Sequence, residues 1–217
     1  MSLRLALSIA SGILAGGGLR CASAQTCEPR VLWRDVRSAG ERATDLVFLP
    51  DGFRAGEQAA FEASVKKAIE GLERGAASFV RSQREAWNLH VAFVPSGEAC
   101  PSRPGEPPVD SAFLTHVEAR SEGGMIASDD QAIASAARAL APGVDCVIVI
   151  VRSRGNIGFA TGDLPLEGGR VRLPEGMENA LLHELGHSLY ALGDEYAARD
   201  VALPAHERSV VALYPNV

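Results

Sequence analysis

Two histidines and one glutamate in the segment HELGHSLYALGDEY have residue types and a spacing that suit a metal site. His183 and His187 are four residues apart, so on a helix they project from one face, about one turn from each other. Both imidazoles can then bind one ion, and imidazole nitrogen is a common ligand of zinc. The H-E-x-x-H pattern therefore predicts a Zn2+ site on a helix.

Glu184 directly follows the first of these histidines, which places its carboxylate beside the metal ion rather than on it. From that position it can accept a proton from a water molecule that the metal activates, and later pass the proton to a leaving amine. Hydrolysis of this kind needs no covalent intermediate. We therefore predict Glu184 as the general base of a hydrolytic site.

A catalytic zinc ion usually needs a third protein ligand and one open position. Gly193 is expected to end the helix, after which the chain can fold back and bring Asp194 nearest to the metal. Carboxylate oxygen is acceptable to zinc, so we predict Asp194 as the third ligand. Glu195 and His206 remain alternatives, and the two adjacent carboxylates could instead lie in a solvated turn or hold a ligand histidine in place.

A helix from about Met177 to Leu192 is expected to carry the motif, because its composition suits a helix and Gly193 follows as a C-terminal cap. Leu181 and Leu185 mark its buried side. Another helix is predicted over residues 57–74, where apolar residues recur at helical spacing. The members of that stripe are Phe61, Val65, Ile69 and Leu72.

A further helix is predicted to open with a capping box formed by Ser128 and Gln131, and to end at Pro142. Apolar runs predict strands over residues 46–50, 89–94 and 146–151, the last of them central and covered on both faces. His90, within the second run, is interpreted as a strand-face residue rather than a ligand. Shorter, more exposed strands are expected over residues 157–161 and 171–173. This order of elements indicates an α/β or α+β layered domain.

The first 24 residues have the pattern of a cleavable secretory signal, with a short apolar stretch followed by small residues at positions 22 and 24. A short membrane anchor is the alternative. Cleavage would leave one domain over residues 25–217, secreted or periplasmic and without stable membrane insertion. Loss of Arg4 and Arg20 would take the formal net charge from -6 to about -8, which argues against a nucleic-acid partner.

The cysteines fit an oxidising compartment. Cys21 would leave with the signal, whereas Cys27 and Cys100 lie in polar, proline-flanked segments and could form a disulfide. Cys146 stands in the apolar run CVIVIV and is interpreted as a buried thiol.

The segment HELGHSLYALGDEY resembles the extended motif of the bacterial IgA-peptidase-type zinc metallopeptidases, the sixty-fourth metallopeptidase family. In that motif H-E-x-G-H-S is followed by a leucine and then by Asp-Glu-Tyr. LVFLPDGFRAGEQAAFEASVKKAIEGL is similar to the family's strand that ends in Asp-Gly-aromatic and leads into a helix. CVIVIV and the glycine-rich segment after it resemble the strand before the active-site region. The resemblance runs from about Asp45 to the C-terminus.

The resemblance implies a zincin-like fold, a mixed sheet packed with helices in which the active-site helix carries HExxH. It also implies a zinc cofactor bound by His183 and His187, Glu184 as the catalytic residue and Asp194 as the third ligand. The implied activity is that of an endopeptidase with a protein or peptide substrate, which need not be an immunoglobulin. Relatives continue past the motif, so the domain is expected to be incomplete at its C-terminus, Val217.

Two other functions remain open. A secreted binding module could keep zinc for folding without hydrolysing peptides, with a protein group such as His206 in the fourth metal position. A zinc amidase acting on cell-wall peptides would share the motif, because H-E-x-x-H chemistry does not specify the chain that is cut. Residues 158–161 could form an edge strand for an extended peptide, or an ordinary loop.

Overall fold

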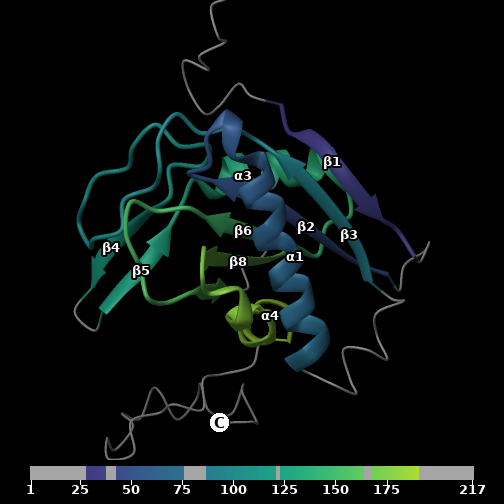
Figure 1. Cartoon of the computed structure of the whole chain (residues 1–217). Helices are drawn as coiled ribbons and strands as arrows, with labels where there is room; N and C mark the ends of the chain where they lie inside the picture. The colour runs from purple at the N-terminus through teal and green to yellow at the C-terminus, as the bar shows by residue number, and fades with distance from the viewer. Residues whose placement is uncertain (1–27, 38–42, 76–86, 121–122, 164–167, 191–217) are drawn as a thin grey trace, which may run out of the picture.

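The computed structural model describes residues 28–37, 43–75, 87–120, 123–163 and 168–190. The strands are β1 Arg30–Asp35, β2 Thr44–Asp51, β3 Trp87–Phe93, β4 His116–Arg120, β5 Gly123–Ala127, β6 Cys146–Val151, β7 Thr161–Asp163 and β8 Gly169–Pro174. Within the described residues, six of them form a sheet in the order β1-β3-β2-β6-β8-β7, and β4 pairs with β5 separately (Figure 1). The inner strands β3, β2, β6 and β8 are parallel, whereas the edge strands β1 and β7 are antiparallel to their neighbours.

Helices cover both faces of this sheet. They are α1 Gln58–Gly75, α3 Asp130–Leu140 and α4 Leu181–Tyr190, with short 3-10 turns η2 Ala55–Glu57 and η4 Glu178–Ala180 before α1 and α4. Successive strand residues point to opposite faces, so one core forms on each side. On one side α1 and α4 pack in a cluster that includes Phe48 and Leu181. On the other side α3 and the β4–β5 pair enclose a cluster that includes Val47 and Ile133.

The mixed α/β architecture predicted from the sequence is confirmed. The three apolar runs lie in β2, β3 and β6, and β6 is buried along its whole length between β2 and β8. In α1 the predicted stripe faces the core, with Phe61 and Val65 fully buried. His90 lies in β3 as predicted, with its Nε2 atom 3.0 Å from Asp45 Oδ1.

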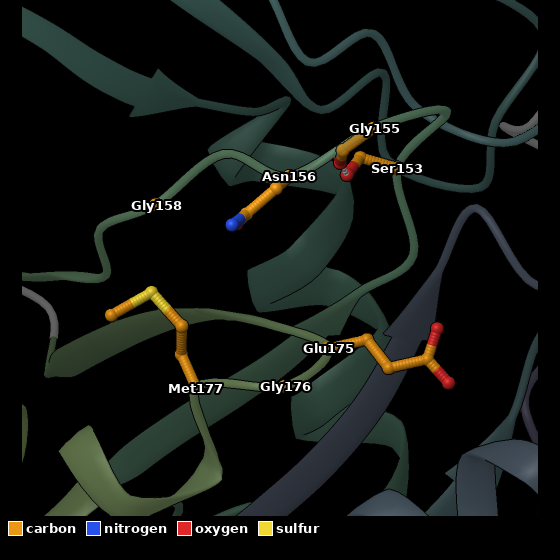
Figure 2. A pocket seen from close by; sticks show the side chains of 7 residues that line it. All are labelled: Ser153, Gly155, Asn156, Gly158, Glu175, Gly176 and Met177. Atoms are coloured by element: carbon orange, nitrogen blue, oxygen red, sulfur yellow. Dashed lines mark hydrogen bonds between the residues drawn. The ribbon is translucent and has the colours of Figure 1, made fainter.

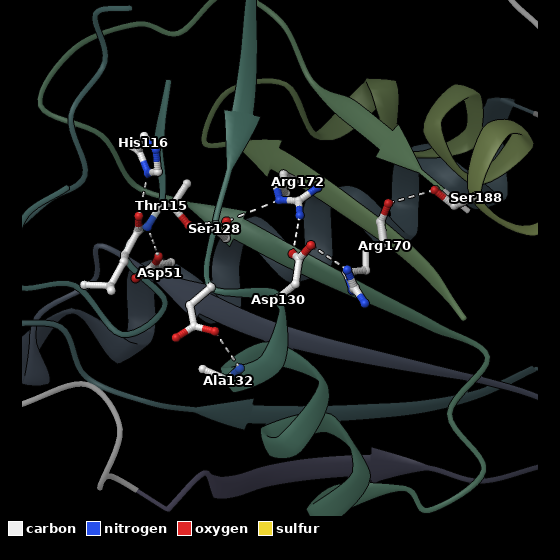
Figure 3. Close-up of polar contacts among 11 residues, drawn as sticks. Asp51, Thr115, His116, Ser128, Asp130, Ala132, Arg170, Arg172 and Ser188 are labelled. Carbon is white, nitrogen blue, oxygen red and sulfur yellow. Dashed lines mark hydrogen bonds and ion pairs between the residues drawn. The ribbon is translucent and has the colours of Figure 1, made fainter. Parts of the chain in front are cut away.

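The predicted N-cap of α3 is wrong by one residue. Asp129 is the N-cap, and its carboxylate accepts a hydrogen bond from the Ala132 amide at 3.0 Å (Figure 3). The hydroxyl of Ser128 instead lies 2.8 Å from Thr115 Oγ1 and accepts a bond from Arg172 Nε at 3.2 Å. Aspartate caps a helix as well as serine does, and a buried guanidinium requires acceptors, which together account for the shift.

The strands expected after β6 differ from the structure in position and burial. β7 begins only at Thr161, so residues 157–160 lead into the strand rather than forming it. β8 is largely buried rather than exposed, because it lies inside the sheet with α4 against one face and α3 on the other. β1, β4 and β5 were not predicted from the sequence.

A fully buried carboxylate organises the connection between β3 and β4. Asp51, the last residue of β2, has no exposed surface. It accepts hydrogen bonds from the amides of Phe113 and Thr115 at 3.1 and 3.0 Å, and from the Ser96 hydroxyl at 3.2 Å. Leu114, between the two bound amides, has a φ of 54°, a left-handed conformation that is uncommon for a residue other than glycine.

Cys100 carries a free thiol and is completely buried. Cys27, its partner in the predicted bridge, lies outside the described residues, so the bridge stays a prediction. Burial, reinforced by the nearby Asp51 carboxylate, raises the pKa of the Cys100 thiol. Cys146 is buried with a free thiol, as predicted.

The predicted signal at residues 1–24 also lies outside the described part of the chain. No helix among the described residues is long and apolar enough to cross a membrane.

Candidate metal site

The helix α4 carries His183, Glu184 and His187. It follows β8 directly through η4, so it starts beside the carboxyl ends of the parallel strands and returns across one face of the sheet (Figure 1). Leu181 and Leu185 are buried on that face, at 0% and 2% exposure. The predicted helix starts near residue 177, directly before η4 and α4. Its last predicted residues, 191 and 192, lie outside the described part of the chain.

The two histidine side chains converge. Their Nε2 atoms are 3.0 Å apart, and the ring centroids are 4.6 Å apart at an interplanar angle of 89°. Two nitrogen ligands of a tetrahedral zinc ion lie about 3.3 Å from each other when each Zn–N bond is 2.0–2.1 Å. The pair thus has the donor type and nearly the separation for a shared ion. His183 is exposed and His187 is half-buried, so the histidine pair is on the outer side of α4.

Glu184 lies on a different side of the helix, towards β7. It is only 7% exposed, although it is a carboxylate. Its neighbour in space is Gly162 in β7: a Cβ atom built at Gly162 would lie 3.0 Å from Glu184 Oε2 and 2.5 Å from the Glu184 carbonyl oxygen. The carboxylate therefore stands between the ligand face of α4 and the backbone of the edge strand.

α4 is held against the edge of the sheet by small residues. The hydroxyl of Ser188 donates a hydrogen bond of 2.8 Å to the carbonyl oxygen of Arg170 in β8 (Figure 3). Gly169 lies so close to the helix that a Cβ there would be 2.4 Å from the Ser188 carbonyl oxygen. These contacts fix the distance between the helix and β8.

The predicted third ligand lies outside the described residues. The same applies to its alternatives, so the structure places none of Asp194, Glu195 and His206. Among the described residues there is no group of three or more histidine, cysteine, aspartate or glutamate side chains arranged to hold a metal ion. The site as described is thus a histidine pair with an adjacent carboxylate.

Comparison with known families uses a much larger part of the sequence than this motif. The sequence profile of the family described as IgA Peptidase M64 matches residues 35–217. The chain belongs to the IgA Peptidase M64 family. Membership implies a metallopeptidase with a protein substrate, in agreement with the resemblance of the motif segment. No curated protein matched the sequence.

In this M64 chain an open cavity of about 490 Å³ lies at the carboxyl ends of β6 and β8. It is lined by Ser153, Gly155, Asn156, Gly158, Glu175, Gly176 and Met177. Figure 2 shows the side chains of Asn156 and Met177 extending towards each other from the two loops that enclose it. Glu175 points away and forms a salt bridge with Arg152, whose pKa is raised mainly by this partner. The loop from Gly176 leads directly into η4 and α4.

The opposite face of β8 carries a charged cluster. Asp130, the first residue of α3, pairs with Arg170 at 2.6 Å and with Arg172 at 2.5 Å (Figure 3). The two arginine side chains are 11% and 4% exposed. β8 is thus held by α4 on one face and by α3 on the other.

The histidines and the glutamate of the M64 motif could be predicted from the sequence, but the contacts that position them could not. Gly162, Gly169 and Arg170 stand in a segment that it interpreted only as glycine-rich with short strands. Each of them contacts α4 across a separation of many residues, and a single sequence gives no sign of such a contact.

Proposed function

We propose that this M64 chain is a zinc-dependent endopeptidase in which Glu184 acts as the general base. The observation that carries the proposal is the joint placement of three side chains on α4. The Nε2 atoms of His183 and His187 converge at 3.0 Å, and Glu184 is buried on the adjacent side of the same helix. A rigid helix that presents two ligands and a carboxylate is preorganised for metal-assisted hydrolysis.

His183 and His187 would hold the metal ion, with Asp194 as the proposed third ligand. Zinc, when bound, supplies Lewis acidity, which polarises a carbonyl group and lowers the pKa of water towards about 7. Glu184 accepts the proton of the attacking water on its carboxylate and then delivers it to the leaving amine nitrogen. The burial of Glu184 keeps the carboxylate in one position between α4 and β7 during both transfers.

We further propose that the peptide substrate lies along β7. This strand ends the sheet within the described residues, and its pairing with β8 uses only one of its two edges. An extended peptide can add to such an edge through main-chain hydrogen bonds. Because Gly162 in β7 adjoins Glu184, a peptide bound there would pass close to the base.

The predicted cleavable signal over residues 1–24 supports a secreted or periplasmic location, where proteins and peptides of other cells are accessible. This location is a proposal from the N-terminal sequence alone. It agrees with a protein substrate.

The decisive experiment compares the purified chain with its Glu184→Gln variant. Glutamine has nearly the same shape but cannot act as a base, so turnover of a peptide library should fall about 100- to 10,000-fold. Metal analysis should find zinc in both proteins at the same ratio to protein.

Equal cleavage by the variant and the parent would contradict the role of Glu184. Zinc binding without cleavage by either protein would instead favour a zinc-binding module. Cleavage confined to cell-wall peptides would favour the amidase.

A further inference from the structure

We propose that Gly162 is a positioning residue for Glu184. The absence of a side chain at this point of β7 lets the backbone of the edge strand approach α4 closely enough to fix the carboxylate. The inference rests on the proposed function in that it treats Glu184 as the base.

The space beside Gly162 is too small for any other residue. A Cβ atom there would lie 2.5 Å from the Glu184 carbonyl oxygen, 2.8 Å from Ser188 Oγ and 3.0 Å from Glu184 Oε2. Carbon and oxygen atoms that are not bonded to each other make favourable contacts only at longer distances, about 3.5 Å. Gly162 is not among the glycines with positive φ, so the requirement for glycine comes from space and not from backbone conformation.

The contact reaches both the main chain and the carboxylate of Glu184. A substituent at Gly162 would have to displace the helix backbone, turn the carboxylate away from β7, or both. Turning the carboxylate moves the base relative to His183 and His187, whereas displacing the helix moves all three residues together, because they share α4. A shift of about 1 Å in a reacting group can lower a rate about 100-fold.

A second glycine provides a matched comparison. Gly169 in β8 also approaches α4, but the three atoms nearest to a Cβ built there all belong to Ser188, with distances of 2.4 Å to the carbonyl oxygen and 3.1 Å to Cβ. A methyl group at Gly169 therefore acts first on Ser188 and the docking of the helix, whereas one at Gly162 acts directly on Glu184. The two positions separate helix docking from placement of the base.

The test compares Gly162→Ala and Gly169→Ala in the full chain. Both changes should lower the midpoint of thermal unfolding, since each forces a close contact apart. Gly162→Ala should lower kcat about 10- to 100-fold with little change in KM, whereas Gly169→Ala should change kcat less than about 3-fold. Zinc affinity, measured against a competing chelator, should stay within about 3-fold of the parent in both variants.

Crystal structures of the metal-free variants give a reading that does not depend on activity. The Glu184 carboxylate should be displaced in Gly162→Ala and unmoved in Gly169→Ala. An unmoved carboxylate in Gly162→Ala, or equal losses of kcat in the two variants, would overturn the proposal and leave Gly162 as a packing residue.

If the parent chain cleaves no peptide, the proposed function fails, and the crystal structures still decide whether Gly162 fixes the carboxylate. If Gly162→Ala does not fold, two double variants replace the single ones. They are Gly162→Ala/Ser188→Ala and Gly169→Ala/Ser188→Ala. Removal of the Ser188 hydroxyl relieves one of the three contacts at Gly162, and it is common to both members of the pair.

Discussion

The side chains of the candidate site differ in their exposure, and the difference matches their proposed tasks. His183 and His187 reach the outer side of α4, where an ion and a substrate can approach. Glu184 is 7% exposed and rests against β7. A base that packing holds in place needs no rearrangement before it accepts a proton.

At this scale the metal ligands can be tested individually. His187→Ala removes one of two converging Nε2 atoms, so the dissociation constant for zinc should rise more than about 100-fold, beyond the usual effect of losing a group outside the ligand set. Competition with a chromogenic chelator measures this change. His116→Ala is the control, because His116 lies in β4 and contacts the Leu114 carbonyl. A similar loss of affinity in both variants would remove His187 from the site.

At the scale of elements, β8 determines where α4 lies. Its carbonyl at Arg170 accepts the Ser188 hydrogen bond, and its glycine at position 169 sets the closest approach of the helix. On the other face its two arginines both form ion pairs with Asp130 of α3. The placement of the motif helix therefore depends on a helix that does not touch the candidate site.

Asp130→Ala tests this support. The variant leaves two largely buried guanidinium groups without their shared carboxylate, and loss of one partner from a buried ion pair is strongly destabilising. Because Asp130 is itself 45% exposed, we expect a reduced cost of about 2 kcal/mol in the free energy of unfolding. Urea denaturation measures it. Gln131→Ala, at the neighbouring exposed position, should change the stability by less than about 0.5 kcal/mol. Equal stabilities of the two variants would show that the cluster contributes nothing.

At the scale of the whole molecule, the two cores are independent of the metal. The largest fully buried side chains lie in the strands, in α1 and α3, around Phe53, and at Leu181 and Leu185 of α4, and none of them is a proposed ligand. We therefore expect the sheet to fold without the ion. In this respect the chain would differ from small zinc domains that are unfolded without metal.

Metal removal tests that independence. After treatment with a chelator the chain should keep its far-ultraviolet circular dichroism and a cooperative thermal transition. Zinc at 100 times its dissociation constant should then stabilise the folded state by about 2.7 kcal/mol. Loss of the cooperative transition on chelation would contradict this expectation and favour zinc as a structural ion.

The sequence predicted those parts of the fold that depend on local patterns. The apolar run of β6 and the helical stripe of α1 identify their elements, because burial on a strand or a helix face has a fixed period. β8 was misjudged because its two arginines suggest exposure. Their burial depends on Asp130, about 40 residues earlier in the chain, which local patterns do not reveal.

The candidate site divides in the same way. The convergence of His183 and His187 was predicted, because it follows from a spacing of four on one helix. The contact between Gly162 and Glu184 joins two elements, β7 and α4, and no pattern in the local sequence predicts it. The third ligand was predicted from sequence order alone, and Asp194 remains a prediction.

The buried carboxylate of Asp51 has a consequence for the order in which the chain folds. Its partners in the connection between β3 and β4 are 45 to 64 residues further along the sequence. Closing a loop of that length costs entropy before any hydrogen bond forms. During synthesis Asp51 leaves the ribosome well before Thr115, so its carboxylate is hydrated until the connection has been made. The connection becomes ordered when its amides replace that water.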